Sequence, residues 1–284
     1  MRPLAADVQG QGDTLVVFLH GIGGGRGIWA GSVHAAAKAG FKAAAVDLPG
    51  YGDSLDAGPA TLANMAQRVA TFVDAQAAQR TVLVGHSMGG MVAQELVARR
   101  LVAADALVLA CTTAAFGKPG GDWQQAFVAE RLAPLDRGLG MAGVAARLVP
   151  GMVSPNALPA AAAFAQGVMA GVPEATYRAA LQSIVAFDRR EALAAITVPT
   201  LLIAGEHDRT APPAVMQRMA ERIPGSRFTV LRDAGHIANV EQPQAFDHAL
   251  IAFIAALRSP EGRASPSPSP RESTKVAEPH FIER

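Results

Sequence analysis

The sequence is poor in cysteine. Cys111 is the single cysteine among 284 residues, so no disulfide can form within the chain. It ends the apolar run LVLAC, and a free thiol in such a run packs as a small hydrophobic group. We therefore expect Cys111 to be buried and inert, and the fold to depend on its hydrophobic core.

Long uncharged apolar runs are also missing. A membrane-spanning helix needs at least about 18 consecutive apolar residues, and the sequence has no such run. The opening residues MRPLAADVQGQGDTLVV contain no apolar stretch between a basic start and a cleavage site, so no secretory signal is expected. These absences predict a cytoplasmic protein without a membrane partner. The abundance of alanine, arginine and glycine favours a bacterial source.

Neither sign of charge is in excess. The chain has 25 lysine and arginine residues against 24 aspartate and glutamate residues, a formal net charge of +1. Proteins that bind nucleic acid usually carry a clear basic excess, so no nucleic-acid partner is expected. Hydrophobic residues make up 50% of the chain, and its length fits one core with an insertion.

Short apolar runs alternate with helical patterns along the chain. The predicted strands are Thr14–Leu19, Lys42–Asp47, Thr81–Gly85, Ala106–Ala110, Thr200–Gly205 and Phe228–Leu231. The predicted helices between them are Thr61–Ala78, Met88–Arg100, Pro213–Ile223 and Pro243–Leu257. The strands show no polar alternation, as expected of strands covered on both faces. The pattern predicts an α/β fold with a mostly parallel central sheet flanked by helices.

Two stretches depart from this alternation. Residues 116–196 contain no convincing strand and favour helices separated by proline and glycine, including a break at Pro150–Gly151. Residues 258–284 are rich in serine, proline and charge, which predicts a disordered tail. We therefore expect a core of residues 1–115 and 197–257, a helical insertion over 116–196, and the tail.

The strongest chemical signal is the pattern G-x-S-x-G at Gly85–Gly89. It follows the apolar strand TVLV directly and precedes the helical run MVAQELVARR. A strand-to-helix elbow forces its central serine into a strained turn, and glycines on either side remove the Cβ atoms that would collide there. This context predicts Ser87 as a nucleophile exposed at the carboxyl edge of the sheet.

A serine nucleophile needs a base, and His236 is the best candidate. It lies in the sequence DAGH directly after the strand FTVL, which places it on a loop at the same edge of the sheet. An unperturbed histidine titrates near about pH 6.5, so activity should fall in acid if a histidine is the base. His20 and His86 belong to tight motifs and are expected to be structural.

The base in turn needs a carboxylate that fixes its tautomer. Asp208 follows the strand TLLIAG in the sequence GEHDR, and it gives the chain order serine, aspartate, histidine that this kind of fold uses. Glu206 and Asp233 lie close by in the sequence and stay open as alternatives.

Acyl transfer also needs two backbone N–H groups that stabilise the oxyanion. Met88, directly after the nucleophile, is the first candidate, and Ile22 in the glycine-rich loop HGIGGG is the second. The same glycines could suggest a dinucleotide-binding loop. They do not fit G-x-G-x-x-G, and no acid that could bind a ribose follows at the required distance.

Taken together, these motifs resemble the α/β-hydrolase superfamily. The carrying sequences are HGIGGG, DLPGYGDS, GHSMGG, GEHDRTAPP and GHIANVEQP, which fall in the family's order between about Leu15 and Leu257. The resemblance implies a helical cap over the active site, where residues 116–196 stand. Within the superfamily the chain is similar to small carboxylesterases and 3-oxoadipate enol-lactonases, on the run FDRREALAAITVPTLLIAGEHDRTAPP and on HIANVEQP.

The predicted function is hydrolysis of a small carboxylic ester or lactone through an acyl-enzyme, with no metal or organic cofactor. Alternatives on the same triad are a carbon–carbon bond hydrolase and a cofactor-free perhydrolase, and a ligand receptor is the non-enzymatic alternative. Ile237 stands where carbon–carbon bond hydrolases usually have tryptophan. The fold and triad do not determine the natural substrate.

The helical insertion is expected to line the substrate pocket and to favour small or medium uncharged acyl groups. The candidate lining residues are Trp123, Phe127, Met141, Met152, Phe164, Met169 and Phe187. An arginine turned inward would redirect the preference to a lactone that bears a carboxylate. By motif, Arg189 and Arg190 are the nearest candidates for that role.

Overall fold

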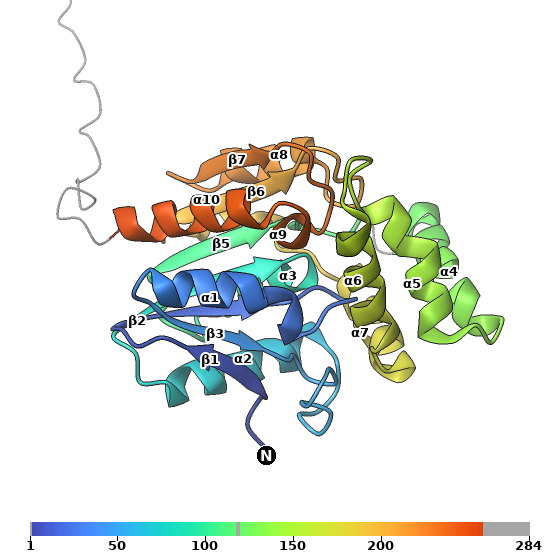
Figure 1. Cartoon of the computed structure of the whole chain (residues 1–284), viewed down its shortest axis with the longest axis horizontal. Helices are drawn as coiled ribbons and strands as arrows, with labels where there is room; N and C mark the ends of the chain where they lie inside the picture. Colours follow the sequence, from blue (N-terminus) through green and yellow to red (C-terminus); the bar gives the residue numbers. More distant parts are fainter. Residues whose placement is uncertain (1, 118–119, 258–284) are drawn as a thin grey trace, which may run out of the picture.

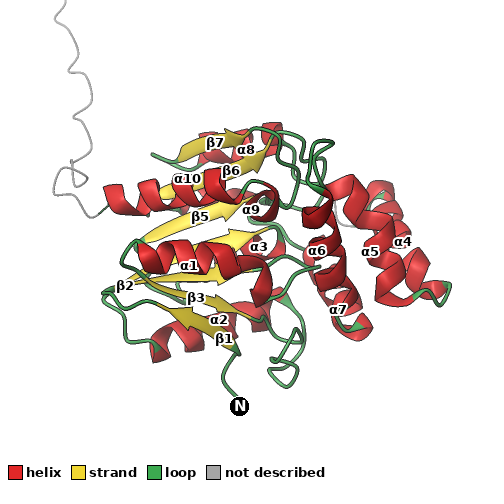
Figure 2. Ribbon diagram, viewed as in Figure 1, coloured by secondary structure: helices red, strands yellow, loops and turns green. Residues whose placement is uncertain are grey.

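A seven-stranded sheet forms the centre of the part of the chain that the computed structural model describes, residues 2–117 and 120–257. The expected tail, residues 258–284, lies outside it. The strands follow the order β1-β3-β2-β4-β5-β6-β7 across the sheet. They are β1 (Ala6–Gln9), β2 (Thr14–Leu19), β3 (Lys42–Val46), β4 (Arg80–His86), β5 (Ala106–Ala110), β6 (Thr200–Gly205) and β7 (Arg227–Leu231). The predicted α/β fold with a mostly parallel sheet is confirmed (Figures 1 and 2).

The sequence predicts the central strands well and the two edges less well. β2, β5 and β6 are buried throughout and have the predicted bounds. β1 was not expected, because its short sequence ADVQ is mostly exposed, and it pairs antiparallel with β3. β7 is half exposed, so the expectation that every strand is covered on both faces is wrong there. An edge strand needs cover on one face only, and its sequence can therefore be less apolar.

Helices cover both faces of the sheet and enclose two hydrophobic cores. Helices α1 (Ala30–Lys38) and α10 (Pro243–Ala256) lie over one face, where Trp29 packs against Phe18 of β2 and against Phe246 of α10. The opposite face is covered by α2 (Leu62–Ala75), α3 (Met88–Ala98) and α8 (Pro213–Arg222). Short helices η1 (Arg26–Trp29) and α9 (Ala238–Glu241) complete the loops at one end of the sheet.

Four further α-helices lie between β5 and β6 in the chain. They are α4 (Asp122–Asp136), α5 (Gly140–Met152), α6 (Pro159–Ala170) and α7 (Glu174–Val185), followed by η2 (Arg190–Ala195). Figure 1 shows α4 to α7 beside the carboxyl ends of the parallel strands. The predicted break at Pro150–Gly151 is wrong, because α5 continues to Met152. Pro150 lies in the last turn, where its missing N–H costs the helix a single backbone hydrogen bond.

None of the helices in the described residues is long and apolar enough to cross a membrane.

A buried carboxylate braces the loops at the carboxyl end of β3. Asp47 is 2% exposed and accepts hydrogen bonds from the backbone N–H groups of Arg26 at 2.8 Å and Asp53 at 3.0 Å. The Asp47 carboxylate also forms an ion pair with the guanidinium of Arg26, and this guanidinium binds Asp53 at 2.7 Å as well. A carboxylate that is removed from water needs this full set of partners, because an unpaired buried charge is costly.

Replacing Arg26 should therefore destabilise the fold. We expect Arg26→Met to lower the free energy of unfolding by about 3 kcal/mol, because it leaves the Asp47 carboxylate buried without its cation. Arg2→Met is the control, since Arg2 and Asp56 form an ion pair at 3.6 Å in which both side chains are largely exposed. That control should lose less than about 1 kcal/mol. Equal losses in urea unfolding would contradict the assignment.

Candidate active site

Ser87 stands at a sharp elbow between β4 and α3. Its backbone has φ 52° and ψ −118°, a strained conformation for a residue with a side chain. The elbow is tight, because a Cβ on Gly85 would collide with the carbonyl oxygen of Gly89, and a Cβ on Gly89 with that of Leu19. The glycines of G-x-S-x-G therefore allow two pieces of backbone to touch, and Ser87 is pushed outward from the end of β4.

His236 and Asp208 continue a chain of hydrogen bonds from Ser87. His236 Nε2 lies 3.0 Å from Ser87 Oγ, and His236 Nδ1 lies 2.9 Å from Asp208 Oδ2. His236 is 2% exposed and Asp208 is 3% exposed, so bulk water has little access to these hydrogen bonds. The structure thus brings together the three side chains that the sequence selects as nucleophile, base and orienting acid.

The surroundings of Asp208 keep its carboxyl group ionised. Burial raises the pKa of Asp208, but the neighbouring His236 and the backbone hydrogen bonds outweigh that effect and leave the pKa below its ordinary value. The two backbone donors are Thr210 at 2.8 Å and Ala211 at 2.9 Å, both to Oδ1. Because Oδ1 is occupied in this way, Oδ2 is aimed at the ring of His236.

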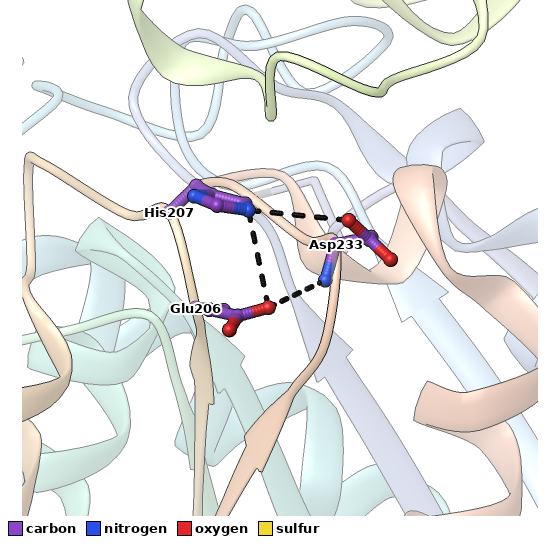
Figure 3. A group of neighbouring side chains, drawn as sticks. All are labelled: Glu206, His207 and Asp233. Carbon is purple, nitrogen blue, oxygen red and sulfur yellow. Dashed lines mark hydrogen bonds and ion pairs between the residues drawn. The ribbon is translucent and has the colours of Figure 1, made fainter.

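The two alternative acids, Glu206 and Asp233, form a separate group around His207 (Figure 3). His207 Nε2 lies 3.9 Å from Glu206 and 4.0 Å from Asp233, and Glu206 also accepts a hydrogen bond from the backbone N–H of Asp233 at 3.0 Å. Both carboxylates are exposed. Their ligand atoms could reach one metal ion, yet nothing else in the described residues points to an ion there. Asp208, and neither alternative, contacts His236.

The two expected oxyanion donors both border the cavity at Ser87. Met88 is the first residue of α3, where a backbone N–H has no partner within the helix. Ile22 lies in the loop after β2, and its carbonyl oxygen accepts a hydrogen bond from the hydroxyl of Tyr51 at 3.0 Å. This hydrogen bond fixes the peptide group that follows Ile22 and so restrains the loop. The positive end of the α3 dipole adds to the attraction for an anion at this place.

His20 and His86 are both buried and neutral. Burial lowers the pKa of His20 to about 4, although its hydrogen bond to the Gly21 carbonyl oxygen opposes this effect. Its other nitrogen accepts from the backbone N–H of Leu48 at 3.1 Å, a pair of contacts that only a neutral ring can make. Burial and the neighbouring His236 lower the pKa of His86 to about 3. His86 Nε2 donates to the carbonyl oxygen of His236 at 2.6 Å.

Glu241 is a buried carboxylate that the sequence interpretation missed. It accepts hydrogen bonds from the backbone N–H groups on either side of His236, those of Gly235 at 3.0 Å and Ile237 at 3.1 Å. It also accepts from Ser154 at 2.6 Å, just beyond the end of α5. Its position five residues after His236 is the one signal in the sequence, and a lone acid at the end of a short helix is too common to single out.

Two cavities meet at Ser87 and His236. The smaller comprises about 440 Å³ of empty space and the larger about 590 Å³, in both cases including space that is open to solvent. Aliphatic side chains dominate the smaller cavity, chiefly Ile28, Val168, Ile237 and Val240. The larger cavity is also mostly apolar, but it contains Arg131 and Tyr177 among its lining residues. If a substrate carbonyl lies at Ser87, the groups on its two sides can therefore each occupy one of the two cavities.

The helical segment supplies part of this lining. Phe127, Met152 and Met169, three of the seven expected residues, border the cavities. The other four are buried in the core or exposed: Met141 and Phe187 are buried, and Trp123 and Phe164 are exposed. Sequence periodicity could not separate these groups, because aromatic and methionine side chains pack against other helices as readily as they face a ligand.

The comparisons with known proteins identify the family of the chain. Residues 16–249 match the sequence model of the alpha/beta hydrolase family. The chain belongs to this family. It is 34% identical, over 91% of its own length and 98% of the relative's, to a Variovorax paradoxus protein assigned as the carbamate hydrolase RutD. It is 30% identical, over 90% of its length and all of the relative's, to the pimeloyl-[acyl-carrier protein] methyl ester esterase of Pectobacterium atrosepticum. As the sequence predicts, this α/β hydrolase is an enzyme.

Solved structures show the same likeness. The enol-lactonase of Burkholderia xenovorans LB400 superposes with a TM-score of 0.79 at 27% identity, covering 89% of this chain and 96% of that one. A thermophilic esterase from Thermogutta terrifontis, in a malate-bound structure, gives a TM-score of 0.80 at 27% identity and covers 90% and 94%.

The buried neutral histidines should make the stability of this hydrolase sensitive to acid. The pKa of His20 is about 4 in the folded state, below the ordinary value of about 6.5 that applies when the chain is unfolded. The unfolded chain therefore binds the proton first as the pH falls. The stability that the neutral ring supports is complete above about pH 6.5 and is lost progressively towards pH 4, at up to about 1.4 kcal/mol per pH unit.

We expect His20→Gln to flatten the dependence of the unfolding free energy on pH between 6.5 and 4. The readout is the slope from urea unfolding at a series of pH values, so a uniform loss of stability does not affect it. His34→Gln, at an exposed position on α1, is the control and should keep the wild-type slope. Identical slopes for all three proteins would refute the prediction.

Proposed function

We propose that this chain is a serine hydrolase that cleaves a small carboxylic ester or lactone through an acyl-enzyme. The observation that carries the proposal is the continuous hydrogen-bonded series of Ser87, His236 and Asp208, with distances of 3.0 Å and 2.9 Å. A nucleophile, a base and an orienting carboxylate in this geometry are the requirement for acyl transfer. The esterases and the enol-lactonase among the similar proteins support this substrate class.

In the proposed mechanism His236 Nε2 accepts the proton of Ser87 as the serine oxygen bonds to the substrate carbonyl carbon. The N–H groups of Ile22 and Met88 stabilise the oxyanion that forms. His236 then protonates the leaving alkoxide, the ester C–O bond breaks, and the acyl group stays on Ser87. A water molecule, deprotonated by His236, attacks the acyl-enzyme, and Ser87 regains its proton when the carboxylic acid leaves. Asp208 stabilises the imidazolium during both steps.

Residues 116–196 are proposed to act as the cap of this site, on a core of residues 1–115 and 197–257. Met152 and Met169 border both cavities, and they come from α5 and α6 of that segment. The walls they form are apolar, and a substrate that fills them displaces water, which strengthens the electrostatic interactions at Ser87. Such a cap selects a small-molecule substrate by the shape of its acyl and alcohol groups.

Cleavage of a carbamate is a second candidate, because the relative with 34% identity is assigned as a carbamate hydrolase. The same triad can attack a carbamate carbonyl. The apolar walls of the two cavities favour an ester or lactone with hydrocarbon groups over a small polar carbamate. Turnover of short p-nitrophenyl esters beside release of ammonia from a simple carbamate distinguishes the two functions.

Ser87→Ala should abolish hydrolysis of p-nitrophenyl butyrate almost completely. We expect kcat to fall by about 10³-fold or more, because the base then has no nucleophile to activate. Ser226→Ala, on a loop away from the site, is the control and should retain wild-type kcat. A Ser87→Ala variant that folds and keeps more than about a tenth of wild-type activity would exclude Ser87 as the nucleophile.

Glu241→Gln should lower kcat more than it raises KM. The neutral amide accepts through a single oxygen, so both N–H groups beside His236 lose a charged acceptor, at least one of them loses its acceptor altogether, and the ring is held less firmly. We expect a loss of about 10-fold or more in kcat for the same ester. Glu221→Gln, at an exposed position on α8, is the matched control and should change neither constant. A fall in thermal stability at unchanged kcat would show that Glu241 stabilises the fold and does not position His236 for catalysis.

A further inference from the structure

The larger cavity holds two polar side chains on an otherwise apolar wall that begins at Ser87. They are Arg131 on α4 and Tyr177 on α7, and their neighbours in the wall include Phe116, Leu148 and Ile184. The smaller cavity has no arginine or lysine among its lining residues. The two sides of the site therefore differ in charge.

The guanidinium of Arg131 is held in place, but it has no close carboxylate partner among the described residues. Its Cζ atom lies 3.2 Å from the centroid of the Phe127 ring, and the side chain is 18% exposed. The nearest carboxylate in the described residues is Glu130, at 4.0 Å, which lies nearer to Arg147 at 3.6 Å and is itself half exposed. Burial lowers the pKa of Arg131, yet an arginine stays protonated in proteins. Its charge is therefore available to a ligand.

Tyr177 offers a second donor beside this charge. It is 1% exposed, and none of the hydrogen bonds among the described side chains involves its hydroxyl group. Burial raises the pKa of Tyr177 to about 12, an effect that the nearby Arg131 partly opposes. At neutral pH the hydroxyl group keeps its proton and can donate it. Tyr177 borders the cavity, so a ligand or water there can accept a hydrogen bond from its hydroxyl group.

The sequence favours Arg189 and Arg190 as the arginines that face the substrate. In the structure neither of them faces the cavities at Ser87. Arg189 pairs with Glu95 at 2.8 Å, and Arg190 pairs with Asp188 at 2.6 Å. Neither borders the two cavities at Ser87. The arginine that faces the site is therefore Arg131. Its presence replaces the expected preference for uncharged acyl groups with a preference for a substrate that bears a carboxylate.

We propose that Arg131 and Tyr177 form a subsite for a carboxylate carried by the substrate at a distance from the carbonyl that Ser87 attacks. The inference rests on the proposed function and narrows its substrate class to esters or lactones with one free carboxylate. A planar guanidinium matches a carboxylate through two parallel N–H donors, and the tyrosine hydroxyl can donate to a remaining lone pair. A single cation balances one negative charge, which favours a carboxylate over a phosphate dianion. The apolar wall between Ser87 and Arg131 suits a hydrocarbon spacer.

Monomethyl adipate and methyl hexanoate test this subsite, because they have acyl chains of six carbons and differ in the terminal carboxylate. We expect the wild-type enzyme to prefer the adipate ester in kcat/KM, and Arg131→Met to reduce that preference by about 10- to 100-fold. Arg147→Met, which removes the exposed arginine beside the same Glu130, is the control and should keep the preference. Arg131→Lys should retain part of it, since a lysine keeps the charge without the planar fork.

Direct binding separates this inference from the proposed function. Adipate, which cannot be hydrolysed, should bind the wild-type protein in calorimetry more tightly than 1,6-hexanediol, and Arg131→Met should lose that difference. Should Arg131→Met fail to fold, Tyr177→Phe removes one donor at constant shape and should weaken adipate binding several-fold. Hydrolysis of both esters without a preference, together with no binding of adipate, would overturn the subsite and leave the esterase. Binding of adipate without hydrolysis of either ester would overturn the proposed function and leave the subsite.

Discussion

The close approach of two backbones behind Ser87 is the constraint on which the rest of the site depends. Gly85 and Gly89 have no side chains, so the end of β4 and the first turn of α3 can lie against each other and against the end of β2. That contact keeps Ser87 at a positive φ and turns its hydroxyl group away from the sheet. It also places the start of α3 and the loop after β2 on the same side of Ser87, where two N–H groups can serve one oxyanion.

The second half of the site depends on buried carboxylates that accept hydrogen bonds from backbone N–H groups. Asp47 holds the loops near the glycine-rich segment, and Glu241 holds the backbone on both sides of His236. Each carboxylate replaces lost hydration with several N–H donors, so the loops are fixed without disulfides. Asp208 uses the same principle, since two backbone donors on one oxygen leave the other oxygen for the imidazole ring.

The sequence was sufficient for the fold and for bringing Ser87, Asp208 and His236 together. All three follow strands of a parallel sheet, and the carboxyl ends of such strands meet at one edge, so order along the chain translates directly into proximity. β1 escaped prediction because an exposed edge strand of four residues has no apolar pattern. Arg131 and Glu241 escaped it because their roles depend on which helix face meets a cavity or loop, and that packing is not encoded in local periodicity.

Hydrogen bonds join the backbone around His236 to the end of α5. The backbone N–H of His236 donates to the carbonyl oxygen of Met152 at 2.6 Å, at the end of α5, and Glu241 joins the same two segments through Ser154. A substrate so bulky that it pushes this end of α5 aside also releases the backbone of the base. If His236 is the base, we expect such a compound to occupy the site and still fail to react, so that large substrates are discriminated against in the chemical step as well as in binding.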